Sequence, residues 1–331
     1  MKLKSLILGS AAAMMAFTGA QAADAIVAEP EPMEYVKVCE TYGSGWHYIP
    51  GTETCLRFSG YVRTQYDWSE GSDRIGWGGR ARFNIDVREE TDYGTLRGFL
   101  RLQSDIVTTD GVAATGVATD STVVLDQMYI ELGGWFFGYA DSNWVRNEYG
   151  GYTIFDGAYG YHQSNIIAYK YAANGFQAII SLERNFAQHR YAPNPLLHLS
   201  YAGSWGKVFA VGVLDLETGN TVAYAIKAGI QLNLDAIAPG DLFRLQGSWG
   251  NSRAPYLTGR RWEMLASFLH VFNSEWSIRF TYTTFDRFSN SSGSVQLRWN
   301  PVPNLSIRNE VRYINPGRNN WQWRARIVRS F

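Results

Sequence analysis

Apolar and polar residues alternate strictly along most of this chain, in segments of about ten residues, and this pattern constrains the fold most. It is clear over residues 80–88, 96–103, 276–283 and 305–313. In the first of these, the odd positions from Ala81 to Val87 are apolar, and the even positions are Arg80, Arg82, Asn84, Asp86 and Arg88. Successive side chains of a strand point to opposite faces, so each segment has one apolar and one polar face. The chain is therefore predicted to be all-β.

A soluble β-sandwich alternates in the same way, but two details favour a barrel that crosses a membrane. The polar face carries several arginines per strand, and aromatic residues stand near the ends of the apolar face, namely Tyr66, Trp249, Trp299, Tyr313 and Trp321. An apolar band between aromatic girdles, around a polar interior, is typical of a transmembrane barrel. Segments of about ten residues also have the length needed to cross a bilayer at a tilt. We predict a transmembrane antiparallel β-barrel.

The N-terminus indicates export. Lys2 and Lys4 precede an apolar run from Leu6 to Phe17, and Ala20-Gln21-Ala22 follows, which predicts a secretory signal over residues 1–22. The apolar run is too short for a membrane anchor, since a spanning helix needs roughly 20 residues. The chain is 46% hydrophobic and 15% aromatic, yet no later window is apolar throughout. An exported membrane protein without membrane helices has to be a closed barrel, because its backbone polar groups must pair internally.

Counting the alternating segments gives sixteen candidate strands, an even number as single-chain bacterial barrels require. They begin near residues 57, 80, 95, 123, 134, 165, 176, 196, 207, 222, 241, 261, 275, 293, 304 and 321. The segments near 123, 165 and 261 alternate weakly, so fourteen or eighteen strands remain open. Short turns such as 92–94 and 173–175 alternate with longer polar connections such as 108–121. This asymmetry predicts short periplasmic turns and longer external loops.

Two cysteines, Cys39 and Cys55, lie close together near the start of the mature chain. In an exported protein an isolated pair favours a disulfide over a metal site. His47 lies between them, but a zinc site needs a fourth ligand that the sequence does not offer, so no metal is expected. We expect residues 23–56 to form an N-terminal periplasmic extension with a disulfide-stapled loop, ahead of a barrel over residues 57–331.

The residues around these cysteines resemble a known family. Tyr35-Val36-Lys37-Val38-Cys39, Tyr48-Ile49-Pro50-Gly51-Thr52-Glu53-Thr54-Cys55 and Ser59-Gly60-Tyr61-Val62-Arg63 closely resemble the opening of the alphaproteobacterial porins of the Brucella and Rhizobium type. The resemblance implies a sixteen-stranded barrel in the outer membrane, a homotrimer, and a third loop folded inward to narrow the pore. The implied function is passive diffusion of small hydrophilic solutes and ions. The resemblance also implies that outer-membrane lipids and lipopolysaccharide surround the barrel.

The chain ends on an amphipathic segment that finishes with Phe331. A terminal aromatic residue resembles the signal that the outer-membrane insertion machinery recognises. An ordinary final strand is the alternative.

Strand parity predicts a basic wall inside the barrel. The arginines expected at the pore constriction are Arg63, Arg80, Arg82, Arg97, Arg101, Arg308, Arg312 and Arg324, and Arg57, Arg88 and Arg326 share their inward parity. Because the last strand of a closed barrel pairs with the first, these residues form one continuous surface. The stretch 141–162 is the expected third loop, and its Asp141, Glu148 and Asp156 are predicted to lie opposite the arginines. Alternatively, Asp86, Asp105, Glu131 and Glu310 simply neutralise the arginines within a solvated interior.

Other functions fit the sequence less well. The formal net charge is zero, which argues against nucleic acid as a partner. The candidate catalytic bases are His47, His162, His189, His198 and His270, and none lies in a recognisable nucleophile motif. We therefore expect neither enzymatic activity, catalytic residues nor a cofactor. A structural or adhesive barrel without an open pore, and a secreted soluble β-protein, remain as alternatives.

Overall fold

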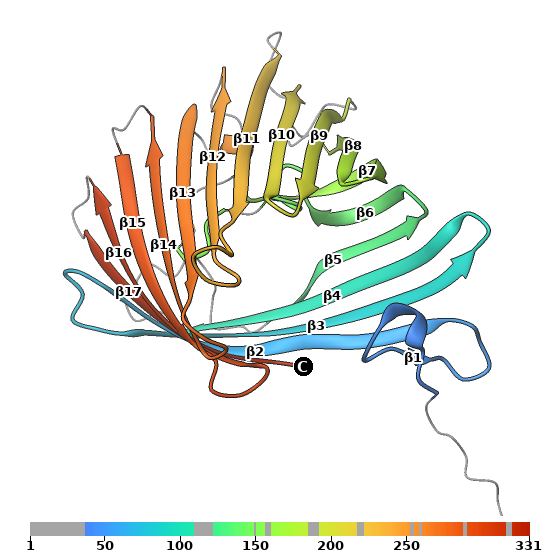
Figure 1. The fold of residues 1–331 in the computed structure, drawn as a ribbon, viewed down its shortest axis with the longest axis horizontal. Coiled ribbons are helices and arrows are strands. Elements are labelled where there is room, and N and C mark those ends of the chain that lie inside the picture. Colours follow the sequence, from blue (N-terminus) through green and yellow to red (C-terminus); the bar gives the residue numbers. More distant parts are fainter. Residues whose placement is uncertain are drawn as a thin grey trace, which may run out of the picture. The chain divides into compact units, whose positions relative to one another are not determined.

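Sixteen antiparallel strands form a closed ring in which each strand pairs with the next along the chain (Figure 1). The ring closes where β17 pairs with β2, in a register that joins Gln322 to Ser69 and Ser330 to Tyr61. The computed structural model describes residues 37–108, 122–148, 150–155, 160–184, 192–216, 222–251, 255–257, 260–286, 290–315 and 320–331. From Val38 onward these residues belong to one compact unit. The predicted signal, residues 1–22, and the first part of the extension lie outside the described residues.

The barrel strands are long on one side of the ring and shorter on the other. Their bounds are β2 (Cys55–Ser69), β3 (Gly76–Thr91), β4 (Gly94–Thr108), β5 (Val123–Leu132), β6 (Trp135–Asp141), β7 (Gln163–Ala173), β8 (Phe176–Glu183), β9 (Asn194–Gly203), β10 (Gly206–Asp215), β11 (Ala223–Asn233), β12 (Leu242–Gly250), β13 (Trp262–Val271), β14 (Trp276–Phe285), β15 (Asn290–Trp299), β16 (Leu305–Asn315) and β17 (Trp321–Ser330). A two-residue strand, β1 (His47–Tyr48), and the 3-10 helices η1 (Glu40–Tyr42) and η2 (Pro255–Leu257) complete the elements.

The predicted barrel and its sixteen strands are confirmed, and fourteen or eighteen strands are excluded. The weakly alternating segments near 123, 165 and 261 are β5, β7 and β13. The largest difference in a starting point is at β3, which begins at Gly76 and not near 80. Its first residues include Gly76, Gly78 and Gly79, which carry no side chain and so interrupt the apolar and polar alternation.

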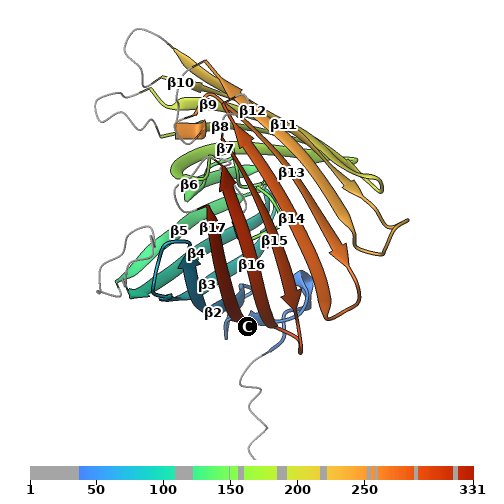
Figure 2. The same ribbon diagram turned by 90° about the vertical axis from the view of Figure 1, so that its left-hand side faces the viewer.

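The outward face of the barrel is apolar and exposed, as at Phe58, Val62 and Ile226. Aromatic pairs lie on this face near the strand ends, with ring centroids 4.8 Å apart for Tyr66 and Trp77 and 5.5 Å apart for Trp276 and Trp299. Figure 2 shows the strands slanting side by side around the ring. Such a band bounded by aromatic side chains suits the hydrocarbon layer of a membrane. Among the described residues, no helix is long and apolar enough to cross a membrane.

The two ends of the barrel differ. At the end that we call the turn end, two-residue turns join β5 to β6, β7 to β8 and β9 to β10. Asn174 and Gly175 form one of them with positive φ values of 50° and 82°, the backbone that a tight hairpin turn requires. The opposite, loop end carries the longer connections. Loop 3, residues 142–162, is the third of these and joins β6 to β7.

The predicted disulfide between Cys39 and Cys55 is present, with a Cα–Cα distance of 6.0 Å. It ties the segment 38–54 to the first residue of β2 at the turn end. Trp46 of this segment is 1% exposed, and the guanidinium groups of Arg57 and Arg88 lie 4.8 and 4.7 Å from its ring centroid. The Tyr42 hydroxyl donates to Glu90 over 2.7 Å, and burial together with this bond raises the pKa of Tyr42 to about 12.

Candidate functional site

The space enclosed by the barrel, its lumen, is lined by the polar face of the strands. On β3 and β4, Arg80 donates to Asp105 over 2.5 Å and Arg82 donates to Gln103 over 3.0 Å, each pair being direct cross-strand partners. The predicted arginines Arg63, Arg80, Arg82, Arg97, Arg101, Arg308, Arg312 and Arg324 all lie on this face. We call the lumen side of β2–β4 and β14–β17 the arginine wall. Arg279 on β14 and Arg298 on β15 share the lumen-facing parity of their strands and extend it, although the sequence interpretation did not include them.

Carboxylates on the wall itself neutralise one half of it. Asp86 is 1% exposed and lies 2.8 Å from Arg97, 3.1 Å from Arg88 and 3.8 Å from Arg57. Asp67 lies 2.5 Å from Arg324. These ion pairs fix Arg57, Arg88, Arg97 and Arg324 in place, because a guanidinium held by a carboxylate has few alternative geometries.

Asp126 completes this half, at 3.5 Å from Arg82 and 3.6 Å from Arg101. Sequence reasoning did not assign Asp126 to the lumen, because it stands at a β-bulge where the pairing of β4 with β5 shifts register. A bulge breaks the alternation on which a prediction of facing depends. Asp67, by contrast, shares the parity of Arg57 and Arg63 on β2 and could have been found from the sequence.

Loop 3 folds into the lumen, as predicted. At its start, Ser142 and Asn143 donate to the buried Glu183 of β8 over 2.6 and 2.8 Å. Trp144 and Val145 then pack, both 0% exposed, against an apolar patch of the inner wall. The patch consists of Leu196, Phe209, Val211, Val213 and Ala225 of β9–β11, and Tyr256 and Leu257 of η2 belong to the same buried cluster. The buried Lys227 of β11 donates to the carbonyl of Trp144.

The second part of loop 3 crosses to the arginine wall. Tyr152 donates its N–H to Ser267 of β13 over 2.9 Å, and the Thr153 hydroxyl lies 2.8 Å from Thr281 of β14. The N–H groups of Ile154 and Phe155 then donate to Glu310 of β16 over 2.5 and 2.7 Å. The Phe155 ring lies against the guanidinium groups of Arg312 and Arg324, at 5.3 and 4.3 Å. Loop 3 therefore follows the inner wall from β8 to β16 and leaves the opening beside β2–β4.

The acidic residues of loop 3 do not face the arginine wall in the part of the chain that is described. Glu148 is 2% exposed, contacts Lys207 of β10 and lies 3.4 Å from His198 of β9. Burial alone would raise the pKa of Glu148, but His198 and Lys207 outweigh it and hold the pKa below the ordinary glutamate value. Asp141, at the end of β6, accepts hydrogen bonds from Tyr161 and Gln163. A buried carboxylate is stable only beside such partners, and each of these two side chains has them.

The third predicted acidic residue, Asp156, lies outside the described residues. What loop 3 presents to the lumen instead is Arg146, which is 3.4 Å from Glu131 and stacks over Phe136 at 4.2 Å. The carboxylates opposite loop 3 are those of the wall. In the described residues, the carboxylates beside the arginines of β2–β4 therefore come from the strands, as at Asp86 and Asp105, and not from loop 3.

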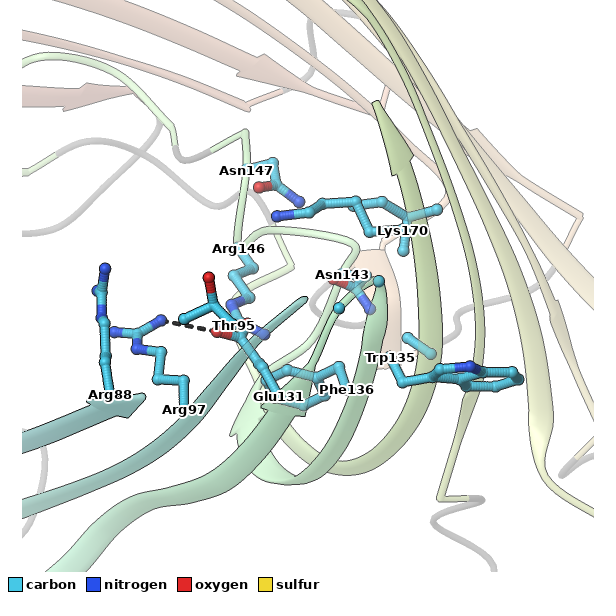
Figure 3. A pocket seen from close by; sticks show the side chains of 14 residues that line it. Arg88, Thr95, Arg97, Glu131, Trp135, Phe136, Asn143, Arg146, Asn147 and Lys170 are labelled. Atoms are coloured by element: carbon cyan, nitrogen blue, oxygen red, sulfur yellow. Dashed lines mark hydrogen bonds and ion pairs between the residues drawn. The ribbon is translucent and has the colours of Figure 1, made fainter. Parts of the chain in front are cut away.

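A polar cavity of about 410 Å³ lies between loop 3 and the turn end. Figure 3 shows Arg88 and Arg97 entering it from β3 and β4, and Arg146 and Asn147 from loop 3. Lys170 of β7 extends toward Asn147, and Glu131 holds Arg97 at 2.9 Å. The cavity is thus a water-accessible vestibule in which positive side chains outnumber negative ones.

The chain is similar to known proteins in sequence and in fold. A family model described as a porin subfamily matches residues 24–328. The porin Omp2b of Brucella neotomae is 34% identical over 377 residues, covering 100% of both chains, and that of Brucella canis is 42% identical over 240 residues, covering 65% of this chain and 66% of the relative.

Two solved structures share the fold. The outer-membrane channel DcaP of Acinetobacter baumannii superposes with a TM-score of 0.67 at 12% identity, covering 86% of this chain and 99% of that one. A triple mutant of the Rhodopseudomonas blastica porin superposes with a TM-score of 0.59 at 16% identity, covering 83% of this chain and 100% of that one.

Proposed function

Since this chain belongs to the porin subfamily and is an outer-membrane diffusion channel and not an enzyme, we propose that its narrowest point lies between loop 3 and the arginine wall. The solutes that pass are small, hydrophilic molecules and ions, as the polar lining requires. The observation that carries the proposal is the path of loop 3, which takes up the lumen beside β8–β16 and leaves the arginines of β2–β4 at the opening.

The constriction is formed by Arg63, Arg80, Arg82, Arg97, Arg101, Arg308, Arg312 and Arg324 on the wall side. On the side of loop 3, Glu148 and Asp141 act as anchors of the loop, because their carboxylates are buried against β6–β10. Arginines outnumber carboxylates among the described residues of the wall. Charged rings at a constriction select ions by sign, so the pore favours anions.

A planar-bilayer measurement with a potassium chloride gradient tests this proposal. We expect steady single-channel conductance and a reversal potential whose sign shows selectivity for chloride over potassium. Absence of conductance from correctly folded protein would contradict an open pore. A reversal potential that shows cation selectivity would be compatible with an open pore. It would contradict the proposal that the arginine wall forms the constriction.

The ends of the chain and the assembly complete the proposal. Residues 1–22 serve as a signal peptide, and the stapled extension up to residue 56 lies on the periplasmic side of the barrel over 57–331. Phe331 marks the last strand for the insertion machinery, and its N–H and carbonyl both pair with Gly60 of β2, over 3.1 and 3.0 Å. Three copies form a homotrimer among outer-membrane lipids and lipopolysaccharide. Chemical crosslinking of native membranes tests the trimer, and the Phe331→Ala variant tests insertion through its yield in the outer membrane.

A further inference from the structure

Three arginines stand directly side by side on neighbouring strands of the arginine wall. Arg298 of β15 is the cross-strand partner of Arg308 of β16, and Arg308 is the cross-strand partner of Arg326 of β17. Neighbouring strands are about 4.8 Å apart, so the three side chains leave the wall within about 10 Å of one another. On β2 the cross-strand partner of Arg326 is Gln65, and Arg63 lies two residues away on the same face, opposite Arg80 of β3.

No ion pair among the described residues involves Arg63, Arg298, Arg308 or Arg326. Their polar contacts are neutral: Arg308 donates to Ser306 over 3.1 Å, and Arg326 donates to Gln65 over 2.5 Å. The Nε atoms of Arg63 and Arg298 are buried without a hydrogen-bond partner in the described structure. These four arginines therefore differ from the arginines of the wall that Asp67, Asp86, Asp105 and Asp126 neutralise.

The carboxylate of Glu310 on β16 does not serve as the counter-charge for these arginines. It is 1% exposed, and it accepts hydrogen bonds from the N–H groups of Ile154 and Phe155 and, over 2.7 Å, from Gln296. Its oxygens are thus committed to loop 3 and to a neighbouring amide. The row of arginines keeps donors directed at the lumen that no acidic side chain of the described wall satisfies.

Like charges placed directly opposite on neighbouring strands destabilise a sheet, so such a row needs a compensating partner. Guanidinium groups match phosphate and carboxylate oxygens with paired, parallel hydrogen bonds. Deepening the pore function proposed above, we propose that Arg298, Arg308 and Arg326, together with Arg63, form a binding site within the lumen for small oxyanions that carry two or more negative charges. A monovalent chloride ion gains less there, because it cannot contact several guanidinium groups through separate oxygens.

Inorganic phosphate at pH 8, added to open single channels in potassium chloride at constant ionic strength, tests the site. The measured quantity is the phosphate concentration that reduces the current by half. In the Arg308→Gln variant we expect this concentration to rise at least about tenfold, since one hydrogen bond between charged groups contributes on that scale. The Arg88→Gln variant is the matched control, because it also loses one lumen guanidinium, but one that Asp86 holds and that lies outside the proposed constriction. Its half-blocking concentration should change less than about threefold.

The Arg308→Lys variant separates shape from charge. Lysine keeps the positive charge but lacks the planar fork, so phosphate block should weaken while the chloride reversal potential stays close to that of the wild type. Equal weakening in Arg308→Gln and Arg88→Gln would overturn the site and assign the effect to net charge. A wild-type channel that conducts steadily but that phosphate does not block would also overturn the site, and would leave the pore function intact.

Discussion

The attachment of loop 3 to the arginine wall should depend on one side chain, Glu310. Its two oxygens receive the N–H groups of Ile154 and Phe155, and it is 1% exposed. In a Glu310→Gln variant the side chain keeps its shape but offers one acceptor oxygen and one NH₂ group. At least one loop N–H then faces a donor in place of an acceptor.

The loss can be estimated from this geometry. A hydrogen bond to a charged group contributes about 1.5 to 3 kcal/mol, and one such bond disappears. Such a change lowers the ratio of docked to undocked loop by a factor of about 10 to 150. The remaining anchors at Glu183 and Trp144 hold the first half of loop 3, so only its second half should move.

Single-channel recording measures this movement. We expect the wild type to give a quiet current and Glu310→Gln to give frequent steps to higher conductance, because an undocked loop widens the opening. Glu275→Gln is the control, since Glu275 lies in the exposed turn between β13 and β14 and carries the same charge. Recordings of Glu310→Gln that match the wild type in conductance and in noise would refute the idea that Glu310 holds the loop.

Three further outcomes are expected. In a double Arg82→Gln, Arg101→Gln variant the reversal potential should move toward cations, and an unchanged value in a salt gradient would contradict their place at the constriction. Reducing the bond between Cys39 and Cys55, which are separated by 16 residues, should cost about 3 kcal/mol, and thermal unfolding with and without reductant measures it. Because its pKa is lowered from 4.5 in the folded state, Glu148 stabilises loop 3 above that pH and loses this effect as the pH falls below it. Current noise should therefore grow on acidification, and Glu148→Gln should remove that pH dependence.

The sequence predicted the strands well because lipid on one side and water on the other impose a period of two. Prediction was weakest where that difference disappears. Beneath loop 3 the inner wall is itself apolar, as at Phe209, Val211 and Val213 of β10, because Trp144 and Val145 cover it. Both faces of such a strand are hydrophobic, so alternation alone cannot state which one faces the lumen.

The charged residues also divide into those whose orientation the sequence predicted and those whose orientation it did not. Parity placed the arginines correctly on the inner face, since each belongs to a regular strand. The orientation of Glu148 could not be predicted, because its partners His198 and Lys207 come from distant strands that meet loop 3 only in the folded barrel. The distribution of ion pairs was equally inaccessible, since it depends on the bulge at Asp126 and on the engagement of Glu310 by the loop backbone.

The difference between the paired and the unpaired arginines of the wall follows from where loop 3 docks. Had Glu310 remained free, it would be the natural counter-charge for the arginines of β14–β17, as Asp86 is for those of β2–β4. The loop backbone occupies it, and the same contact that narrows the pore thereby leaves Arg298, Arg308 and Arg326 without an acidic partner. Undocking the loop in Glu310→Gln should then not restore neutrality, because the glutamine carries no charge. Phosphate block should persist in that variant even as conductance rises, so loop position and anion binding can be measured separately.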